Sequence, residues 1–97
     1  MRIALDYDDT FTNDEHLWRM FVNNAKERGH YVAFVTSRYE VGDNSDILTD
    51  AELLGINIVF CNRKPKAECF KADVWIDDNP LMIPSSDSLL MMSLGNR

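Results

Sequence analysis

Apolar residues along the chain follow two alternating spacings, which predict strands interleaved with helices. Short apolar runs that end in polar residues are typical of buried parallel strands, whereas apolar residues three or four positions apart are typical of helices with one buried face. We predict strands at residues 2–6, 31–37, 56–62, 73–78 and 88–93. We predict helices over residues 12–29, from 45 or 46 to 55, and, as a short helix behind Pro65, over 66–72.

The first predicted helix is amphipathic. It carries four apolar residues at helical spacing, namely Leu17, Met20, Phe21 and Ala25. Thr12 or Asn13 is expected to cap its start, and Gly29 is expected to end it.

Strands that alternate with helices indicate an α/β fold. We expect a Rossmann-like, doubly wound and mostly parallel sheet of about five strands in the order 3-2-1-4-5, with right-handed crossovers. The 97 residues suit one domain, 1–97, with a modest hydrophobic core. In such sheets the ligand crevice lies beyond the carboxyl ends of the strands, near the point where strand order reverses. The residues at the strand ends are therefore the candidates for function.

Composition and charge narrow the classes of function. The chain is 45% hydrophobic and 27% charged, as in ordinary soluble globular proteins, and its formal charge of −6 argues against binding to long nucleic acid or anionic lipid. No apolar run approaches the roughly 18 residues that a membrane span needs, and the first residues lack the zones of a signal peptide. We therefore expect a cytoplasmic protein with no membrane partner.

The cysteines and histidines offer no zinc site or disulfide framework. Cys61 and Cys69 lack close pairing and histidine partners, so we expect both to be reduced, Cys61 at the end of a buried strand and Cys69 on a helix. His16 and His30 have no partners at metal-ligand spacing.

Carboxylates gather at the predicted strand ends. Asp6, Asp8 and Asp9 directly follow the first strand, and like charges placed together raise one another's pKa, so a neutralising partner is expected. The other polar residues at the same edge of the sheet are Thr36 and Ser37 after the second strand, Asp77 and Asp78 after the fourth, and Lys66 at the start of the preceding helix. Such a set of hard oxygen ligands suits Mg²⁺ together with a phosphate group.

The chemistry of these groups suggests a role for each. Asp6 suits a nucleophile toward phosphorus, and Asp8 suits a general acid and base. Thr36 would donate a hydrogen bond to a phosphoryl oxygen, while Lys66 would supply positive charge. Asp77 and Asp78 would complete the metal shell, with Asp78 as the direct ligand and Asp77 acting through water or as an orienting group.

The order of these motifs resembles the haloacid dehalogenase-like (HAD) phosphohydrolase superfamily over roughly residues 2–80. "DYDDT" matches its DxDxT signature at Asp6, Asp8 and Thr10, "VAFVTS" is similar to its second motif at Thr36, and "VWIDDNP" is similar to its terminal acidic motif. The resemblance implies a Mg²⁺-dependent phosphomonoesterase that works through an aspartyl-phosphate on Asp6, with Asp8 as general acid/base. It also implies that the main-chain carbonyl of Asp8 binds the metal.

Two details depart from the family pattern or stay open. Asp9 stands where many relatives carry glycine, and the segment "NRKPKAE" offers both Lys64 and Lys66 as the phosphate-site lysine. We favour Lys66, because it starts the helix before the fourth strand. Ser37 and Arg38 are further candidates for substrate binding, and Arg63, Lys64 and Arg38 form either a rim that steers phosphate or plain surface charges.

The chain leaves no room for the cap domain that many relatives insert. An open crevice favours a phosphoprotein, a polynucleotide end or a small substrate covered by a partner subunit. Three aromatic residues near the acidic turn would either stack on a nucleotide base or belong to the core, namely Phe11, Trp18 and Phe21. The physiological substrate and the oligomeric state are open.

Two functions of other classes compete with hydrolysis. A signalling receiver or phosphate-binding module uses a similar set of residues, but it places its phosphoacceptor after strand three, where this chain reads "VFCN" without a carboxylate. A degenerate, non-catalytic HAD-like domain that binds partners is the other alternative.

Overall fold

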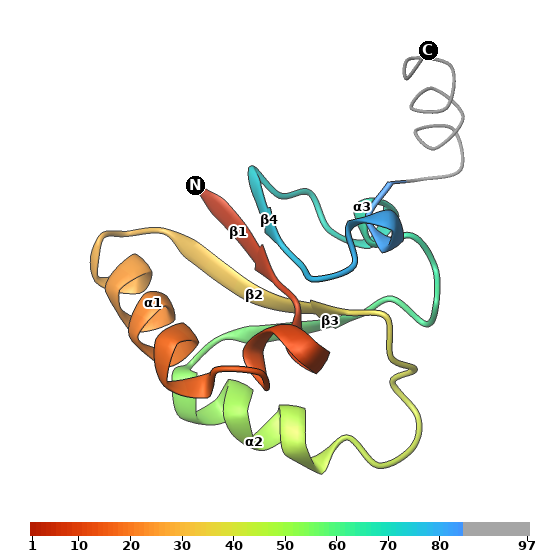
Figure 1. Cartoon of the computed structure of the whole chain (residues 1–97), viewed down its shortest axis with the longest axis horizontal. Helices are drawn as coiled ribbons and strands as arrows, with labels where there is room; N and C mark the ends of the chain where they lie inside the picture. The colour runs from red at the N-terminus through yellow and green to blue at the C-terminus, as the bar shows by residue number, and fades with distance from the viewer. Residues whose placement is uncertain (85–97) are drawn as a thin grey trace.

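Four parallel strands form one sheet in the order β3-β2-β1-β4 (Figure 1). The computed structural model describes residues 1–84. The strands are β1 (Arg2–Leu5), β2 (Tyr31–Thr36), β3 (Asn57–Phe60) and β4 (Val74–Ile76). The α/β class and the order of the first four strands are confirmed, whereas the fifth strand predicted at 88–93 lies outside the described residues.

Helices lie on both faces of the sheet (Figure 1). The two longer helices, α1 (Glu15–Glu27) and α2 (Ser45–Leu54), bury apolar residues in one core cluster with β1 and β2. The short α3 (Lys66–Cys69) lies with the second cluster on the other face. Two single turns, η1 (Tyr7–Phe11) and η2 (Pro80–Met82), follow β1 and β4.

An aromatic cluster anchors the turn that carries the acidic motif. The rings of Tyr7 and Phe11 stack with centroids 5.5 Å apart, and Phe34 from β2 packs edge-on against both, at 5.1 Å and 5.0 Å. Phe11 is fully buried, so it belongs to the core and does not stack on a nucleotide base. Phe21 and Trp18 pack against the larger hydrophobic core cluster that contains these three rings.

Helix α1 starts later than the sequence predicts. Its N-cap is Asp14, whose side chain accepts a hydrogen bond from the Leu17 amide at 3.2 Å, so the predicted caps Thr12 and Asn13 are wrong. The buried face of α1 differs in part from the predicted one. Leu17 and Met20, which the sequence predicts to be buried, are 51% and 60% exposed. The residues that pack inward are Trp18, Phe21, Val22 and Ala25, which also recur at helical spacing.

The ends of the two longer helices agree with the predictions. Gly29 and Gly55 follow α1 and α2 with φ of 85° and 68°, which glycine adopts at little cost, and both end a helix as predicted. Strands β3 and β4 are shorter than predicted, since their ladders contain only Asn57–Phe60 and Val74–Ile76. Among the described residues, no helix has the length and apolar content to cross a membrane.

The strand order places the reversal point between β1 and β4. The chain runs outward through β1, β2 and β3 and then returns to the other side of β1. The amide of Asp6 donates to the carbonyl of Ile76 at 2.9 Å, which joins the carboxyl ends of β1 and β4. Ligands bind at this point in open α/β sheets.

Replacing the observed cap tests the start of α1. We expect Asp14→Ala to lower the free energy of unfolding by about 1 kcal/mol, because the amide of Leu17 loses its acceptor. Urea denaturation followed by circular dichroism measures the change. Asn13→Ala is the matched control, and a loss there equal to that of Asp14→Ala would contradict the assignment.

Candidate active site

A hollow of about 250 Å³ opens at the carboxyl edge of the sheet. Its lining includes all of the residues that the sequence analysis selected for the site, namely Asp6, Asp8, Thr36, Ser37, Arg38, Lys66, Asp77 and Asp78. Asp9, Arg63, Asn79 and Met82 line it as well. We call this hollow the acidic crevice.

Lys66 lies at the centre of the acidic crevice. Its side chain is 3% exposed, and its Nζ donates to Asp6 Oδ1 at 2.8 Å and to Asp77 Oδ2 at 2.5 Å. Burial lowers the pKa of Lys66, but the hydrogen bonds and charges of Asp6 and Asp77 outweigh it and raise the pKa. Lys66 is therefore a buried ammonium, whereas Lys64 is exposed and does not line the crevice.

Asp6 and Asp78 interact as a pair of carboxyl groups. Burial raises the pKa of Asp6 to about 7; Lys66 opposes this rise, and the hydrogen bond with Asp78 adds to it. That same hydrogen bond, followed by one from Thr10, lowers the pKa of Asp78. With a pKa of about 7, the Asp6 carboxyl is protonated below neutral pH in the free protein and ionises as the pH rises through 7.

Thr10 fixes the position of this pair. Its hydroxyl oxygen accepts from the Asp78 amide at 3.0 Å and lies 3.2 Å from Asp6 Oδ2 and 3.0 Å from Asp78 Oδ1. The hydroxyl has one hydrogen, so it donates to one of the two carboxylates at a time. Thr10 thus ties the turn after β1 to the turn after β4.

Three carboxylates could hold a metal ion. Asp6, Asp77 and Asp78 each offer an oxygen, and these oxygens all lie within 4.8 Å of one another. With Lys66 as the neighbouring cation, the three ionised groups leave a formal charge of −2, which a divalent cation would neutralise. Hard carboxylate oxygens fit Mg²⁺. The side chain of Asp8 lies outside this group in the described part of the chain.

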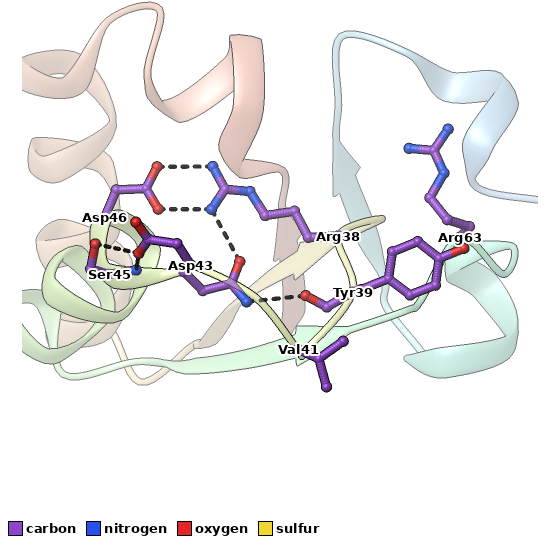
Figure 2. A pocket seen from close by; sticks show the side chains of 8 residues that line it. Arg38, Tyr39, Val41, Asp43, Ser45, Asp46 and Arg63 are labelled. Atoms are coloured by element: carbon purple, nitrogen blue, oxygen red, sulfur yellow. Dashed lines mark hydrogen bonds and ion pairs between the residues drawn. The ribbon is translucent and has the colours of Figure 1, made fainter.

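Asp8 is instead held by Arg38. Its Oδ1 and Oδ2 accept from Arg38 Nη2 and Nε at 2.7 Å and 2.9 Å. Arg38 also donates to both oxygens of Asp46, at 2.7 Å and 2.9 Å (Figure 2). A further hydrogen bond runs from Arg38 to Asn44 Oδ1 at 3.3 Å. All five N–H groups of the guanidinium are thus used. A phosphate contact by Arg38, as predicted, would have to replace one of these acceptors.

Thr36 and Ser37 come from the end of β2. The Thr36 hydroxyl is buried and accepts from the Arg38 amide at 3.2 Å, which leaves its own hydrogen for an acceptor in the crevice. The carbonyls of Thr36 and Ser37 accept from the amides of Cys61 and Arg63 at 2.8 Å and 2.9 Å. These bonds fix the loop after β2 against the loop after β3.

Asn44 fixes the loop after β2, a role that sequence reasoning missed. It precedes α2 in the N-cap position, but its side chain makes no cap hydrogen bond. Its amide instead donates back to the carbonyls of Tyr39 and Glu40 at 3.0 Å each. An asparagine before a helix is a visible signal, but the direction of its hydrogen bonds is decided by the loop and not by the helix.

No known protein family, curated protein or solved structure matches this chain. The resemblance to the HAD superfamily therefore stays a prediction. The functional argument depends on the geometry of the acidic crevice.

The Arg38 network gives a prediction on stability. Arg38→Met keeps the apolar stem and removes five donors, so we expect a loss of about 1–2 kcal/mol in the free energy of unfolding. Guanidine would screen the ion pairs, so urea denaturation at low and high salt is the suitable measurement. Lys64→Met, which changes an exposed charge next to the crevice, should have almost no effect. Equal stability of both variants would show that the network contributes little.

The raised pKa of Asp6 gives a prediction on pH dependence without metal. Between about pH 4 and about pH 7 the folded chain holds a proton on Asp6 that the unfolded chain has lost, so this contribution to stability is complete below pH 4 and disappears as the pH rises through 7. Asp6→Asn is neutral throughout, so we expect the variant to gain on the order of 4 kcal/mol relative to the parent over that interval in EDTA.

Thermal denaturation across this pH range measures the effect, with Asp9→Asn as the control that should retain the slope of the parent. Mg²⁺ competes with the proton for the same oxygens, so it should raise the melting temperature of the parent more at about pH 8 than at about pH 5. Parallel pH profiles for the parent and Asp6→Asn would contradict the assignment.

Proposed function

We propose that this protein is a Mg²⁺-dependent phosphomonoesterase that acts through an aspartyl-phosphate on Asp6. The observation that carries the proposal is the placement of the Asp6 carboxyl at the reversal point of the sheet, 2.8 Å from the Lys66 ammonium and within one group with Asp77 and Asp78. A carboxylate that is flanked by a fixed cation and a metal-binding set is equipped to attack phosphorus.

The residues of the crevice would divide the work between metal and phosphate. Asp6 and Asp78 would hold Mg²⁺ directly; both oxygens of Asp77 already accept hydrogen bonds, from Lys66 and from the Asn79 amide at 2.9 Å, which favours an orienting role for Asp77. Bound Mg²⁺ would supply the positive charge that offsets the repulsion between Asp6 and the phosphate. Thr36 would donate to a phosphoryl oxygen, and Lys66 would hold Asp6 in position.

Two displacements at phosphorus make up the reaction. In the first, an oxygen of Asp6 forms a bond to phosphorus, the bond to the leaving oxygen breaks, and that oxygen takes its electron pair and a proton from Asp8. In the second, a water oxygen attacks the phosphorus, Asp8 takes the proton of the water, and Asp6 leaves as a carboxylate together with inorganic phosphate. Because Arg38 holds both oxygens of the Asp8 carboxylate in the free protein, Asp8 must leave Arg38 and take up a proton from solvent before the first step; the proton that it later takes from water restores it for the next turnover.

The substrate reaches an open crevice. Only η1 and α1 stand between β1 and β2, and only α2, β3 and α3 stand between β2 and β4, so these connections contain no separate cap domain. A nucleotide, a polynucleotide end or a phosphoprotein remains compatible with such a site, and the charge of −6 disfavours long nucleic acid.

One observation favours a second function, a non-catalytic module that binds phosphate and Mg²⁺. The engagement of Asp8 by Arg38 occupies the group that would protonate a leaving oxygen. Such a module would bind phosphate or become phosphorylated without turnover. The experiment below separates the two functions.

Removing the nucleophile tests the proposal. We expect the parent with Mg²⁺ to release phosphate from p-nitrophenyl phosphate, and Asp6→Asn to reduce kcat about a thousandfold or more, because the amide cannot form the acyl phosphate. Asp9→Asn makes the same chemical change nearby and should keep most of the activity. Robust turnover by Asp6→Asn would refute the role of Asp6. A stable phospho-protein with no phosphate release by the parent would establish the module instead.

A further inference from the structure

A second and larger hollow lies beside the acidic crevice. Its volume is about 720 Å³, and it is formed by the loop after β2 and the start of α2 (Figure 2). The two hollows share two lining residues, Arg38 and Arg63, so they adjoin at these side chains. Nothing in the proposed reaction uses the larger hollow, which we call the side pocket.

The two shared arginines differ in their contacts. Arg38 uses all of its donors on Asp8, Asp46 and Asn44. Arg63 is exposed and makes no ion pair or side-chain hydrogen bond with any residue in the range 1–84, and Figure 2 draws no contact for it. Since Lys66 is also paired, Arg63 is the one cation lining either hollow that has a free charge among the described residues.

The backbone holds Arg63 at this junction. Asn62 and Arg63 have φ of 53° and 67°, a conformation that side-chain-bearing residues adopt only when the surroundings enforce it. Their amides donate to the carbonyls of Arg38 and Ser37 at 3.1 Å and 2.9 Å, and Asn62 Oδ1 accepts from the Glu40 amide at 3.1 Å. The base of the Arg63 side chain is thus fixed relative to both hollows.

The surroundings of Arg63 select the kind of anion that would bind. Carboxylates of Asp8, Asp43 and Asp46 line the two hollows on the Arg38 side. They would repel an extended polyanion that reached beyond Arg63. Tyr39 and Val41 line the side pocket and are 55% and 81% exposed, which offers apolar surface to an uncharged molecular body. A compact molecule with its charge concentrated at its ends fits this arrangement.

We propose that Arg63 is a specificity-determining residue that binds a second phosphate group, on a small substrate whose first phosphate occupies the acidic crevice. This inference rests on the proposed function for the first phosphate. Guanidinium groups bind phosphate through two parallel hydrogen bonds, which gives an arginine an advantage over a lysine at such a position. The side pocket then holds the body of the substrate against Tyr39 and Val41.

Equilibrium binding tests this role without turnover. Asp6→Asn protein with Mg²⁺ is titrated by calorimetry with two bisphosphates and their monophosphates: pAp against AMP, and fructose bisphosphate against fructose monophosphate. We expect Arg63→Ala in this background to weaken both bisphosphates about ten- to hundredfold and to leave the monophosphates almost unchanged. Arg63→Lys should restore part of the affinity, and Lys64→Ala, which removes an adjacent exposed cation outside both hollows, should match the parent.

Comparing pAp with fructose bisphosphate shows which kind of molecule the side pocket holds between the two phosphates. If Tyr39→Ala weakens pAp alone, the side pocket accepts a nucleoside ring; if it affects both bisphosphates equally, the pocket recognises the second phosphate without a ring preference. The role of Arg63 is decided by the Arg63 variants alone, whereas Tyr39→Ala decides which kind of molecular body the side pocket holds. In active protein, Arg63→Ala should raise KM for a bisphosphate by a clearly larger factor than KM for p-nitrophenyl phosphate, because only the bisphosphate carries the second phosphate.

The outcomes separate this inference from the proposed function. Equal effects of Arg63→Ala on bisphosphates and monophosphates, or no effect on either, would overturn the inference even if the protein hydrolyses p-nitrophenyl phosphate. Conversely, a bisphosphate preference that depends on Arg63 would stand even if the parent releases no phosphate, and only the hydrolase proposal would then fail.

Discussion

The ammonium of Lys66, enclosed between the carboxylates of Asp6 and Asp77, is the contact around which the carboxyl edge of the sheet is organised. It joins the end of β1 to α3 and the end of β4, which lie about sixty residues further along the chain. Removing either partner of a buried ion pair leaves an uncompensated charge, so each of these groups depends on the others. Asp78 lies beside Asp6 and Asp77, so three carboxylates share the single positive charge of Lys66. Burial is the main reason why the pKa of Asp6 is raised. The uncompensated negative charge of the three carboxylates is the reason why the site suits a divalent cation.

The fold and the gathering of the site residues were predictable from the sequence because they depend on periodicity and topology. Apolar runs located all four described strands, and the rule that parallel strands end at one edge brought Asp6, Thr36 and Asp78 into one crevice. The choice of Lys66 over Lys64 followed from the helix that it begins. The cap of α1 was missed because Thr12, Asn13 and Asp14 all have capping side chains, and only tertiary packing of the η1 turn decides which one is used.

Pairing between charged side chains was not predictable, because it depends on loop geometry at sub-ångström precision. Arg38 and Arg63 look equivalent in the sequence, since each follows a strand and neighbours the crevice. The loop after β2 turns Arg38 toward Asp8 and Asp46, whereas the left-handed backbone at Asn62 and Arg63 leaves the second guanidinium at the junction of two hollows. The same loops explain why Asp8, predicted as a free acid/base and a metal ligand, is held by an arginine in the free protein.

Strand β4 has only three residues, and in the described part of the chain it pairs with β1 alone. Asp77 and Asp78, two of the three carboxylates that could hold a metal ion, directly follow its last residue. Segments with few ladder bonds open more often than central strands, so the amides of β4 should exchange with solvent faster than those of β2. Opening of β4 would separate two of the three carboxylates from Asp6, so an ion bound to all three would lower the population of the open state.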